Sequence, residues 1–208
     1  MMQRREGKLD ITSAMVKELR VKTGAGMMDC KEALTAENGD FEKAIDYLRK
    51  KGMSAATKRS SKAAKDGAVA SYIHMGGKIG VMVEVNCETD FVAKTDDFQA
   101  MARDLAMHVA ASNPRYVRPE EISAADLERE KEICRSQLIA EKKPEKIWDK
   151  IIEGKLNKYF EEVCLMNQKF IKNTDITVGA LVTNMIAKTG ENIVVRRFAR
   201  FQLGEELK

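Results

Sequence analysis

The apolar residues of this chain change their spacing at Gly67, and this change decides the fold class. Residues 67–75 and 79–87 place apolar side chains at every second position, as strands with one buried face do. The Gly-Gly pair between them is a hairpin signal. Residues 193–201 alternate in the same way and can pair beside the hairpin, whereas the apolar residues elsewhere recur at helical spacing. The sequence therefore predicts an α+β fold in which helices pack on a three-stranded antiparallel sheet.

The first part of the chain, residues 11–53, predicts a compact module of three helices. Asp10 or Thr12 can cap the first helix, and Asp40 can cap the third. Residues 23–26, Thr-Gly-Ala-Gly, break the first helix from the second, and Gly52 after three basic residues is a suitable C-cap for the third. The predicted buried stripes of the three helices are Ile11, Met15, Val16 and Leu19, then Met27, Cys30 and Leu34, then Phe41, Ala44, Ile45 and Leu48.

Four segments follow from these patterns. They are a charged leader (1–10), the three-helix module (11–53), a basic linker (54–66) and an α+β core (67–208). The leader has no apolar h-region, so we expect no secretory signal. The basic linker reads either as a linker or as a loosely held helix, and its charges are expected to be solvated.

The core contains further helices. Residues 95–111 predict a helix that Thr95 caps. Residues 120–172 predict highly charged helices, interrupted at Pro144, with Phe170 on their apolar face. Residues 178–186 predict one more amphipathic helix. The buried stripe of the first of these helices is expected to be Phe98, Met101, Ala102, Leu105 and Val109.

Charge and cysteine content exclude several classes of protein. The basic linker holds four basic residues against Asp66, a net +3 of the chain's +4, so the other residues sum to about +1 and we expect no direct nucleic-acid binding. No apolar run approaches the length of a membrane span. The four cysteines lie far apart without a C-x-x-C pair, which argues against a zinc site or a disulfide scaffold and favours a reducing cytoplasm.

The sequence nominates no enzyme active site, no metal site and no cofactor. The two histidines, His74 and His108, stand alone, and a lone histidine in such a place is more often surface or core filler than a ligand. The Thr-Gly-Ala-Gly segment lacks the preceding strand and the G-K-[ST] ending of a phosphate-binding loop, so a turn between helices is the better interpretation.

The string Glu88-Thr89-Asp90-Phe91-Val92, between the second strand and the helix, has two interpretations. In the first, Thr89 or Asp90 caps a turn while Phe91 and Val92 are buried, as most phenylalanines are. In the second, Phe91 is exposed at a strand-to-helix corner and acts as an apolar wedge for a partner. The pair Met27-Met28 poses the same choice, because one of two adjacent helical methionines must lie off the buried stripe.

Four segments resemble a known family. They are Leu19 to Leu34 (LRVKTGAGMMDCKEAL), Asn86 to Val92 (NCETDFV), Ala106 to Val117 (AMHVAASNPRYV) and Gly190 to Phe201 (GENIVVRRFARF). Their sequences and their order are similar to those of bacterial translation elongation factor Ts, in its short form. The likeness covers nearly the whole chain from Ile11, and the leader has no assigned counterpart.

The resemblance implies a guanine nucleotide exchange factor for elongation factor Tu. It implies that the three-helix module is a ubiquitin-associated-like domain in which Met27 and Met28 contact the GTPase. In the string Thr89, Asp90, Phe91 and Val92, it implies that Asp90 and Phe91 enter the GTPase and disturb the surroundings of the Mg²⁺ and the phosphates, so that GDP leaves. Likeness to the short members further implies that residues 67–208 form a homodimer and that the protein is cytoplasmic.

Other functions stay open on the residues alone. One is an RNA- or ribosome-surface-binding protein that uses Lys58, Arg59, Lys62 and Lys65. Another is an adaptor in which only the three-helix module matters. An enzyme is the weakest alternative, because the sequence contains no nucleophile and base in a familiar context.

Overall fold

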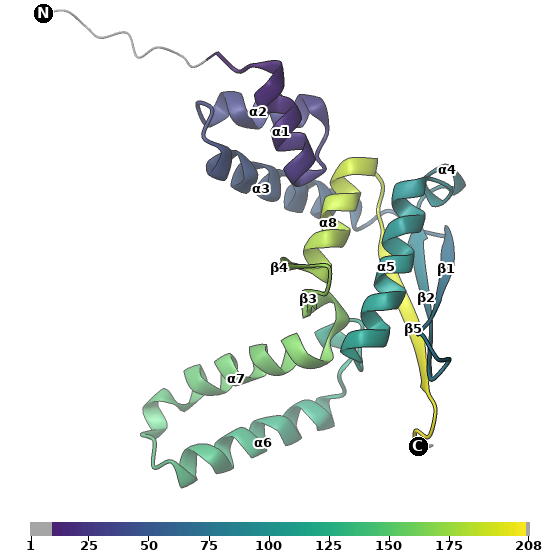
Figure 1. Cartoon of the computed structure of the whole chain (residues 1–208). Coiled ribbons are helices and arrows are strands. Elements are labelled where there is room, and N and C mark those ends of the chain that lie inside the picture. Colours follow the sequence, from purple (N-terminus) through teal and green to yellow (C-terminus); the bar gives the residue numbers. More distant parts are fainter. Residues whose placement is uncertain (1–9, 207–208) are drawn as a thin grey trace, which may run out of the picture.

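The computed structural model describes residues 10–206, and it contains the predicted α+β fold (Figure 1). Three helices come first, followed by a hairpin, a central helix, a long helical hairpin and a final helix and strand. In chain order the helices and strands are α1 (Ser13–Thr23), α2 (Met27–Ala36), α3 (Phe41–Arg59), β1 (Asp66–Ile73), β2 (Ile79–Cys87), α4 (Asp90–Ala93), α5 (Asp96–Ser112), α6 (Ala124–Ala140), α7 (Trp148–Val163), β3 (Lys169–Phe170), β4 (Asn173–Thr177), α8 (Val178–Thr189) and β5 (Val194–Gln202).

The N-terminal helices begin and end largely where the sequence predicts. The Thr12 hydroxyl accepts a hydrogen bond from the amide of Met15, and the Asp40 carboxylate accepts one from the amide of Lys43. Gly24 ends α1 in the left-handed region at φ +70°, so the Thr-Gly-Ala-Gly segment is a turn between helices. The small core of this module consists of Val16, Leu19, Cys30, Ala33, Leu34 and Ala44.

The prediction that the third helix ends at Gly52 is wrong. Helix α3 continues to Arg59 and takes in the first part of the predicted basic linker. Gly52 is buried inside the helix, and a Cβ at this position would lie 3.6 Å from the Cβ of Ala187 on α8. An alanine here would make only ordinary van der Waals contact with α8, so the packing does not require a glycine. The packing of α3 on α8 nevertheless continues the helix past Gly52 and outweighs the local stop signal.

The three-stranded sheet has the order β1-β2-β5, and all its pairs are antiparallel. Val83 on β2 lies opposite Ala70 on β1 and Phe198 on β5. Helix α5 lies along one side of the sheet (Figure 1), and its predicted stripe is buried. The core between them includes Val81, Val83, Val85, Phe98, Leu105 and Val109, each at most 1% exposed.

The opposite face of this sheet carries exposed apolar side chains. On it Ile73, Met82 and Phe201 are 66%, 53% and 71% exposed. At its centre Glu84 accepts a hydrogen bond from Arg197 on the neighbouring strand, at 2.7 Å between Oε2 and Nε. A sheet of three strands thus has one face in the core and one face, partly apolar and partly charged, that residues 10–206 leave uncovered.

Residues 120–172 are only partly helical. Helices α6 and α7 form a hairpin that projects from the body of the molecule (Figure 1), interrupted near Pro144 as predicted. The hairpin has its own small cluster of Cys134, Leu138 and Ile152. The prediction that helix continues to residue 172 is wrong. A short 3-10 turn (Leu165–Asn167) follows α7, and Phe170 then lies in the short strand β3, which pairs with β4 and contributes to the main core.

The remaining predicted helix and strand are confirmed as α8 and β5, with the Thr177 hydroxyl capping α8 at the amide of Ala180. Between Asp10 and Glu206, none of the helices combines the length and the apolar character that crossing a bilayer would demand.

Candidate functional site

The corner between β2 and α5 holds the string Thr89-Asp90-Phe91-Val92. After β2 ends at Cys87, Thr89 takes an extended conformation and becomes the N-cap of the four-residue helix α4. Its hydroxyl accepts a hydrogen bond from the amide of Val92 at 3.4 Å. Ala93 is buried and Val92 is half-buried against the main core, so one side of α4 is anchored.

Phe91 points away from that anchored side and is 80% exposed. The interpretation in which Phe91 is buried in the core is therefore wrong, although its statements about Thr89 as the cap and Val92 as a packing residue are confirmed. A single helical turn cannot direct three consecutive side chains to the same side, and Val92 and Ala93 occupy the inward positions. The geometry is that of an exposed aromatic side chain at a strand-to-helix corner.

Asp90, next to Phe91, forms an ion pair with Lys94 one turn later. The distance between Lys94 Nζ and Asp90 Oδ2 is 2.5 Å, and the lysine holds the pKa of the Asp90 carboxyl below its ordinary value. The Lys94 side chain is largely exposed and that of Asp90 is half-exposed, so the pair contributes little to stability. Asp90 is therefore a charged group at the surface, beside an exposed phenyl ring.

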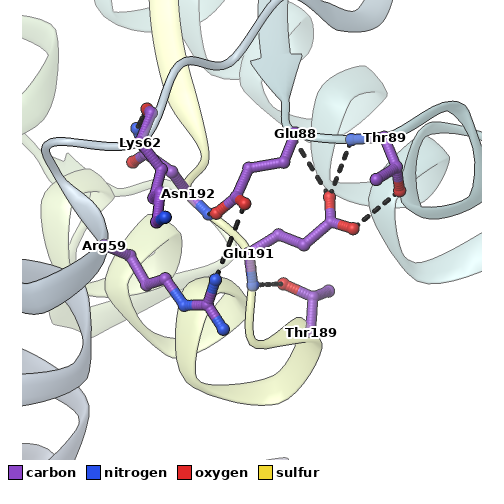
Figure 2. Close-up of polar contacts among 7 residues, drawn as sticks. All are labelled: Arg59, Lys62, Glu88, Thr89, Thr189, Glu191 and Asn192. Atoms are coloured by element: carbon purple, nitrogen blue, oxygen red, sulfur yellow. Dashed lines mark hydrogen bonds and ion pairs between the residues drawn. The ribbon is translucent and has the colours of Figure 1, made fainter.

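The corner is held by Glu191, a residue to which the sequence analysis gave no role. Its Oε2 accepts hydrogen bonds from the backbone amides of Glu88 and Thr89, both at 3.1 Å (Figure 2). Its Oε1 accepts a third from the Thr89 hydroxyl at 2.6 Å. Glu191 stands at the start of the Gly190–Phe201 segment that carries part of the resemblance, but nothing in the sequence places it beside residues about a hundred positions earlier.

The same two segments also form a hydrogen bond in the opposite direction, in which Asn192 is the donor and Glu88 of the corner is the acceptor. The amide of Asn192 donates to Glu88 Oε1 at 2.7 Å, and Arg59 lies 3.6 Å from Glu88 Oε2 (Figure 2). The side-chain amide of Asn192 donates to the carbonyl of Lys62 at 2.7 Å. Three segments that are distant in sequence therefore meet at this point: the end of α3, the β2–α4 corner and the turn after α8.

Met27 and Met28 lie in the first turn of α2, in a different part of the molecule from α4 (Figure 1). Met28 is 77% exposed and Met27 is 42% exposed, while Cys30 and Leu34 of the same helix are fully buried. The expectation that one of the two methionines leaves the buried stripe is met by Met28. The prediction that Met27 lies on that stripe is wrong, because its side chain is 42% exposed and stays outside the core of the module. The six predicted site residues thus lie in two separate places, where Met27, Met28 and Phe91 are exposed and Thr89, Asp90 and Val92 are half-buried.

The buried histidine and the buried thiols are packed inside the fold. Burial lowers the pKa of His108, whose Nδ1 accepts from the amide of Ile171 at 3.3 Å and whose Nε2 therefore donates to Gln168 Oε1 at 3.0 Å. Burial also raises the pKa of the Cys87 and Cys164 thiols to about 11. Within residues 10–206, no three His, Cys, Asp or Glu side chains are grouped so as to hold a metal ion.

Comparison with known proteins gives one consistent family. The family model described as "Elongation factor TS" matches residues 10–205. The chain is 80% identical over 200 residues to an "Elongation factor Ts" of Syntrophus aciditrophicus, a match that covers 96% of this chain and 100% of that protein. It is 60% identical to proteins of the same name from Heliobacterium modesticaldum and Geobacter sulfurreducens, over 95% and 96% of this chain and 92% and 93% of theirs.

Proposed function

The chain belongs to the elongation factor Ts family and is a translation elongation factor, and we propose that it acts as a guanine nucleotide exchange factor for elongation factor Tu. The observation that carries this proposal is the exposed ring of Phe91, held beside the charged Asp90 at a fixed corner of the fold. We place the activity in the cytoplasm, where translation takes place.

In this proposal Phe91 is the wedge. Its ring enters the nucleotide-binding domain of the GTPase near the Mg²⁺ and the phosphates, and Asp90 exchanges its bond with Lys94 for contacts in the partner. Thr89 caps α4 and Val92 packs against the core, so the backbone that carries the ring is held in place. An exposed aromatic side chain on a well-packed support is typical of the residues that dominate an interface.

The mechanism is a difference in binding free energy and involves no bond chemistry on this chain. A protein that binds the nucleotide-free GTPase more tightly than the GDP-bound form weakens GDP binding by the same factor, because the two equilibria are linked. Each tenfold weakening requires about 1.4 kcal/mol of contact energy that exists only in the nucleotide-free complex. Truncation of a buried aromatic anchor at an interface often costs about 2 kcal/mol or more, which is of the size required.

The three-helix module, as a ubiquitin-associated-like domain, supplies the second contact. Met27 and Met28 project from the start of α2, and flexible thioether side chains adapt well to a partner surface. Because this surface is separate from Phe91, it adds affinity for the GTPase without taking part in the displacement of GDP. The linker that joins the three-helix module to the core is short, since α3 continues to Arg59 and β1 begins at Asp66.

We further propose a symmetric homodimer that binds two GTPases. What supports it is the uncovered face of the sheet, on which a monomer would expose several large apolar side chains around the Glu84–Arg197 pair. Pairing the same face of two chains is the simplest closed arrangement and would cover it on both. The largest exposed apolar side chains on or beside this face are Val69, Ile73, Met75, Met82, Phe201 and Leu203.

A second candidate function is binding to RNA or to the ribosome surface through the basic linker. Lys58, Lys62 and Lys65 are exposed, which supports it, whereas Arg59 is already engaged by Glu88. Such binding would weaken steeply with salt and would drop when the three lysines are neutralised. Nucleotide exchange on elongation factor Tu would survive that change.

The test is the release of a fluorescent GDP analogue from elongation factor Tu, with and without this chain. We expect acceleration at chain concentrations well below that of the GTPase, because an exchange factor turns over. The triple variant Lys58→Ala, Lys62→Ala and Lys65→Ala is the matched comparison, and it should keep the acceleration. No acceleration by the unaltered chain would overturn the proposed function, and salt-sensitive RNA binding would then favour the second candidate.

A further inference from the structure

We propose that Glu191 is a positioning residue for nucleotide exchange, which holds the β2–α4 corner so that Phe91 meets the GTPase in a fixed orientation. This inference rests on the proposed function and extends it to a residue that touches neither the GTPase nor the nucleotide. It is carried by the contact between the Glu191 carboxylate and the segment immediately before Phe91 (Figure 2).

One carboxylate satisfies three donors of this segment. Two are consecutive backbone amides, those of Glu88 and Thr89, and the third is the Thr89 hydroxyl. The same hydroxyl accepts from the amide of Val92, the residue after Phe91. A chain of hydrogen bonds therefore runs from Glu191 through Thr89 to the helical turn that presents the ring, and bonds to a charged acceptor are the stronger kind.

The corner has little structure of its own to rely on. Helix α4 has only four residues, and so short a helix is unfavourable in isolation because nucleation costs more than one turn of hydrogen bonds returns. The last paired residue of β2 is Cys87, opposite Asp66, so the amides of Glu88 and Thr89 lie beyond the sheet. Contacts from outside the segment decide its conformation, and Glu191 provides three of them.

Glu191 is itself held in place. Its amide donates to the Thr189 hydroxyl at 3.3 Å, and the next residue, Asn192, is buried and bonded to both Glu88 and the carbonyl of Lys62 (Figure 2). Beyond it Ile193 lies in the main core. The carboxylate thus stands on a rigid turn, which is what a residue that positions another must have.

A fixed corner matters because an exposed ring on a mobile turn would have to be ordered when it enters the partner. That ordering would be subtracted from the binding energy available to displace GDP. This loss of binding free energy would slow the step in which the ring is inserted. It would affect the first encounter with the GTPase much less, because the methionine surface of α2 also contributes to that encounter. Glu191 should therefore affect the maximal rate of GDP release more than the concentration needed for half-maximal effect.

The experiment compares Glu191→Ala and Glu191→Gln with the full-length chain in the GDP-release assay. We expect Glu191→Ala to lower the maximal rate about tenfold while the half-saturating concentration stays within about threefold. Glu191→Gln should recover a large part of the rate, because its oxygen still accepts from the amides and its NH₂ can donate to the Thr89 hydroxyl. Glu121→Ala is the matched control, since it also removes a carboxylate that accepts from a backbone amide, that of Val117, in another loop.

Hydrogen exchange of the free chain gives a readout that does not depend on the GTPase. In Glu191→Ala the amides of Glu88, Thr89 and Val92 should exchange about tenfold faster or more, with core amides of β2 unchanged. If Glu191→Ala does not fold, Thr89→Val removes one of the three bonds to Glu191 together with the cap on the amide of Val92, and it should show the same effects.

Two results would overturn the inference. One is a Glu191→Ala chain that releases GDP at the unaltered rate while Phe91→Ala does not. The other is an unchanged exchange rate of the three corner amides, which would count against Glu191 even if the unaltered chain proved to have no exchange activity. Failure of that activity with faster amide exchange in Glu191→Ala would instead refute the proposed function and leave the structural role of Glu191 intact.

Discussion

The carboxylate of Glu191 lies 2.6 Å from the hydroxyl of Thr89, although 102 positions separate the two residues in the chain. This contact joins the turn after α8 to the corner that displays Phe91. The corner is therefore supported by the C-terminal part of the fold as well as by the sheet from which it emerges. Because both parts of the fold hold the backbone of this corner, the exposed Phe91 ring can bind a partner in a fixed orientation.

Gly52 and Gly24 should respond in opposite ways to alanine. In Gly52→Ala the added Cβ makes ordinary contact with Ala187, and the helix gains about 0.5–1 kcal/mol in propensity, so the free energy of unfolding should rise or stay level. In Gly24→Ala the left-handed backbone at φ +70° becomes strained, which should cost about 1 kcal/mol. Urea unfolding at one fixed protein concentration measures both. Strong destabilisation by Gly52→Ala would contradict the prediction, because it would mean that the α3–α8 contact has no room for the added Cβ.

The sequence alone predicts the regular elements well where periodicity and caps agree. The strand β2 and the stripe of α5 are examples, because each has one buried face and so a clear repeat. The strands β1 and β5 form as predicted, although the apolar residues that alternate in β1 lie on its exposed face and a bulge shifts the repeat of β5. Gly52 led to a wrong prediction of the end of α3. A buried glycine inside a helix cannot be told from a C-cap glycine in the sequence, because its packing partner on α8 lies far along the chain. Phe170 misled in a similar way, since a strand of two residues has no period to recognise.

The candidate site could be predicted in its residues but not in its support. The string around Phe91 is visible in the sequence, whereas its exposure depends on which of the side chains of α4 face the core. Glu191 could not be assigned a role from residue order, because its three bonds are all long-range. Its place beside Gly190 and Asn192, in a segment that carried the resemblance, was the only available signal.

Met28 should contribute affinity for the GTPase more than exchange rate. Met28→Ala is expected to raise the half-saturating concentration for GDP release about three- to tenfold, because an exposed side chain in the interface is lost, and to leave the maximal rate within about twofold. Val21→Ala, equally exposed on α1, is the control and should change neither. Unaltered half-saturation in Met28→Ala would remove α2 from the proposed contact surface.

A charge on the uncovered sheet face should disrupt the proposed dimer. Met82→Glu places a carboxylate beside Glu84 in the middle of the face and should weaken association about a hundredfold or more. Sedimentation velocity at several concentrations measures this. Ile139→Glu, at an exposed position on α6, should leave the sedimentation unchanged. A dimer of undiminished strength in Met82→Glu would show that this face is not the interface.

The buried His108 should make stability depend on pH. Burial holds its pKa below the ordinary value of 6.5, so the unfolded chain binds a proton that the folded chain resists. The contribution of the neutral His108 side chain to the free energy of unfolding is fully present above about pH 6.5. It is lost as the pH falls from there toward the pKa of the folded state, by at most about 1.4 kcal/mol per pH unit.

Thermal unfolding between pH 7.5 and pH 5.5 checks this dependence. His108→Gln should be less stable at pH 7.5 and should lose less stability on acidification than the unaltered chain. Carboxylate titration is common to both chains and drops out of the difference. Parallel profiles for His108→Gln and the unaltered chain would contradict the assignment.

The central claim is that the Phe91 ring drives GDP out of elongation factor Tu. Stopped-flow release of a fluorescent GDP analogue at saturating concentrations of the chain tests it most directly, with Phe91→Ala beside the unaltered protein. Because the ring is 80% exposed in the free chain, Phe91→Ala should leave folding stability unchanged. We expect its maximal release rate to fall more than about tenfold, with a smaller loss of affinity for the GTPase. An unchanged maximal rate in Phe91→Ala would contradict the account.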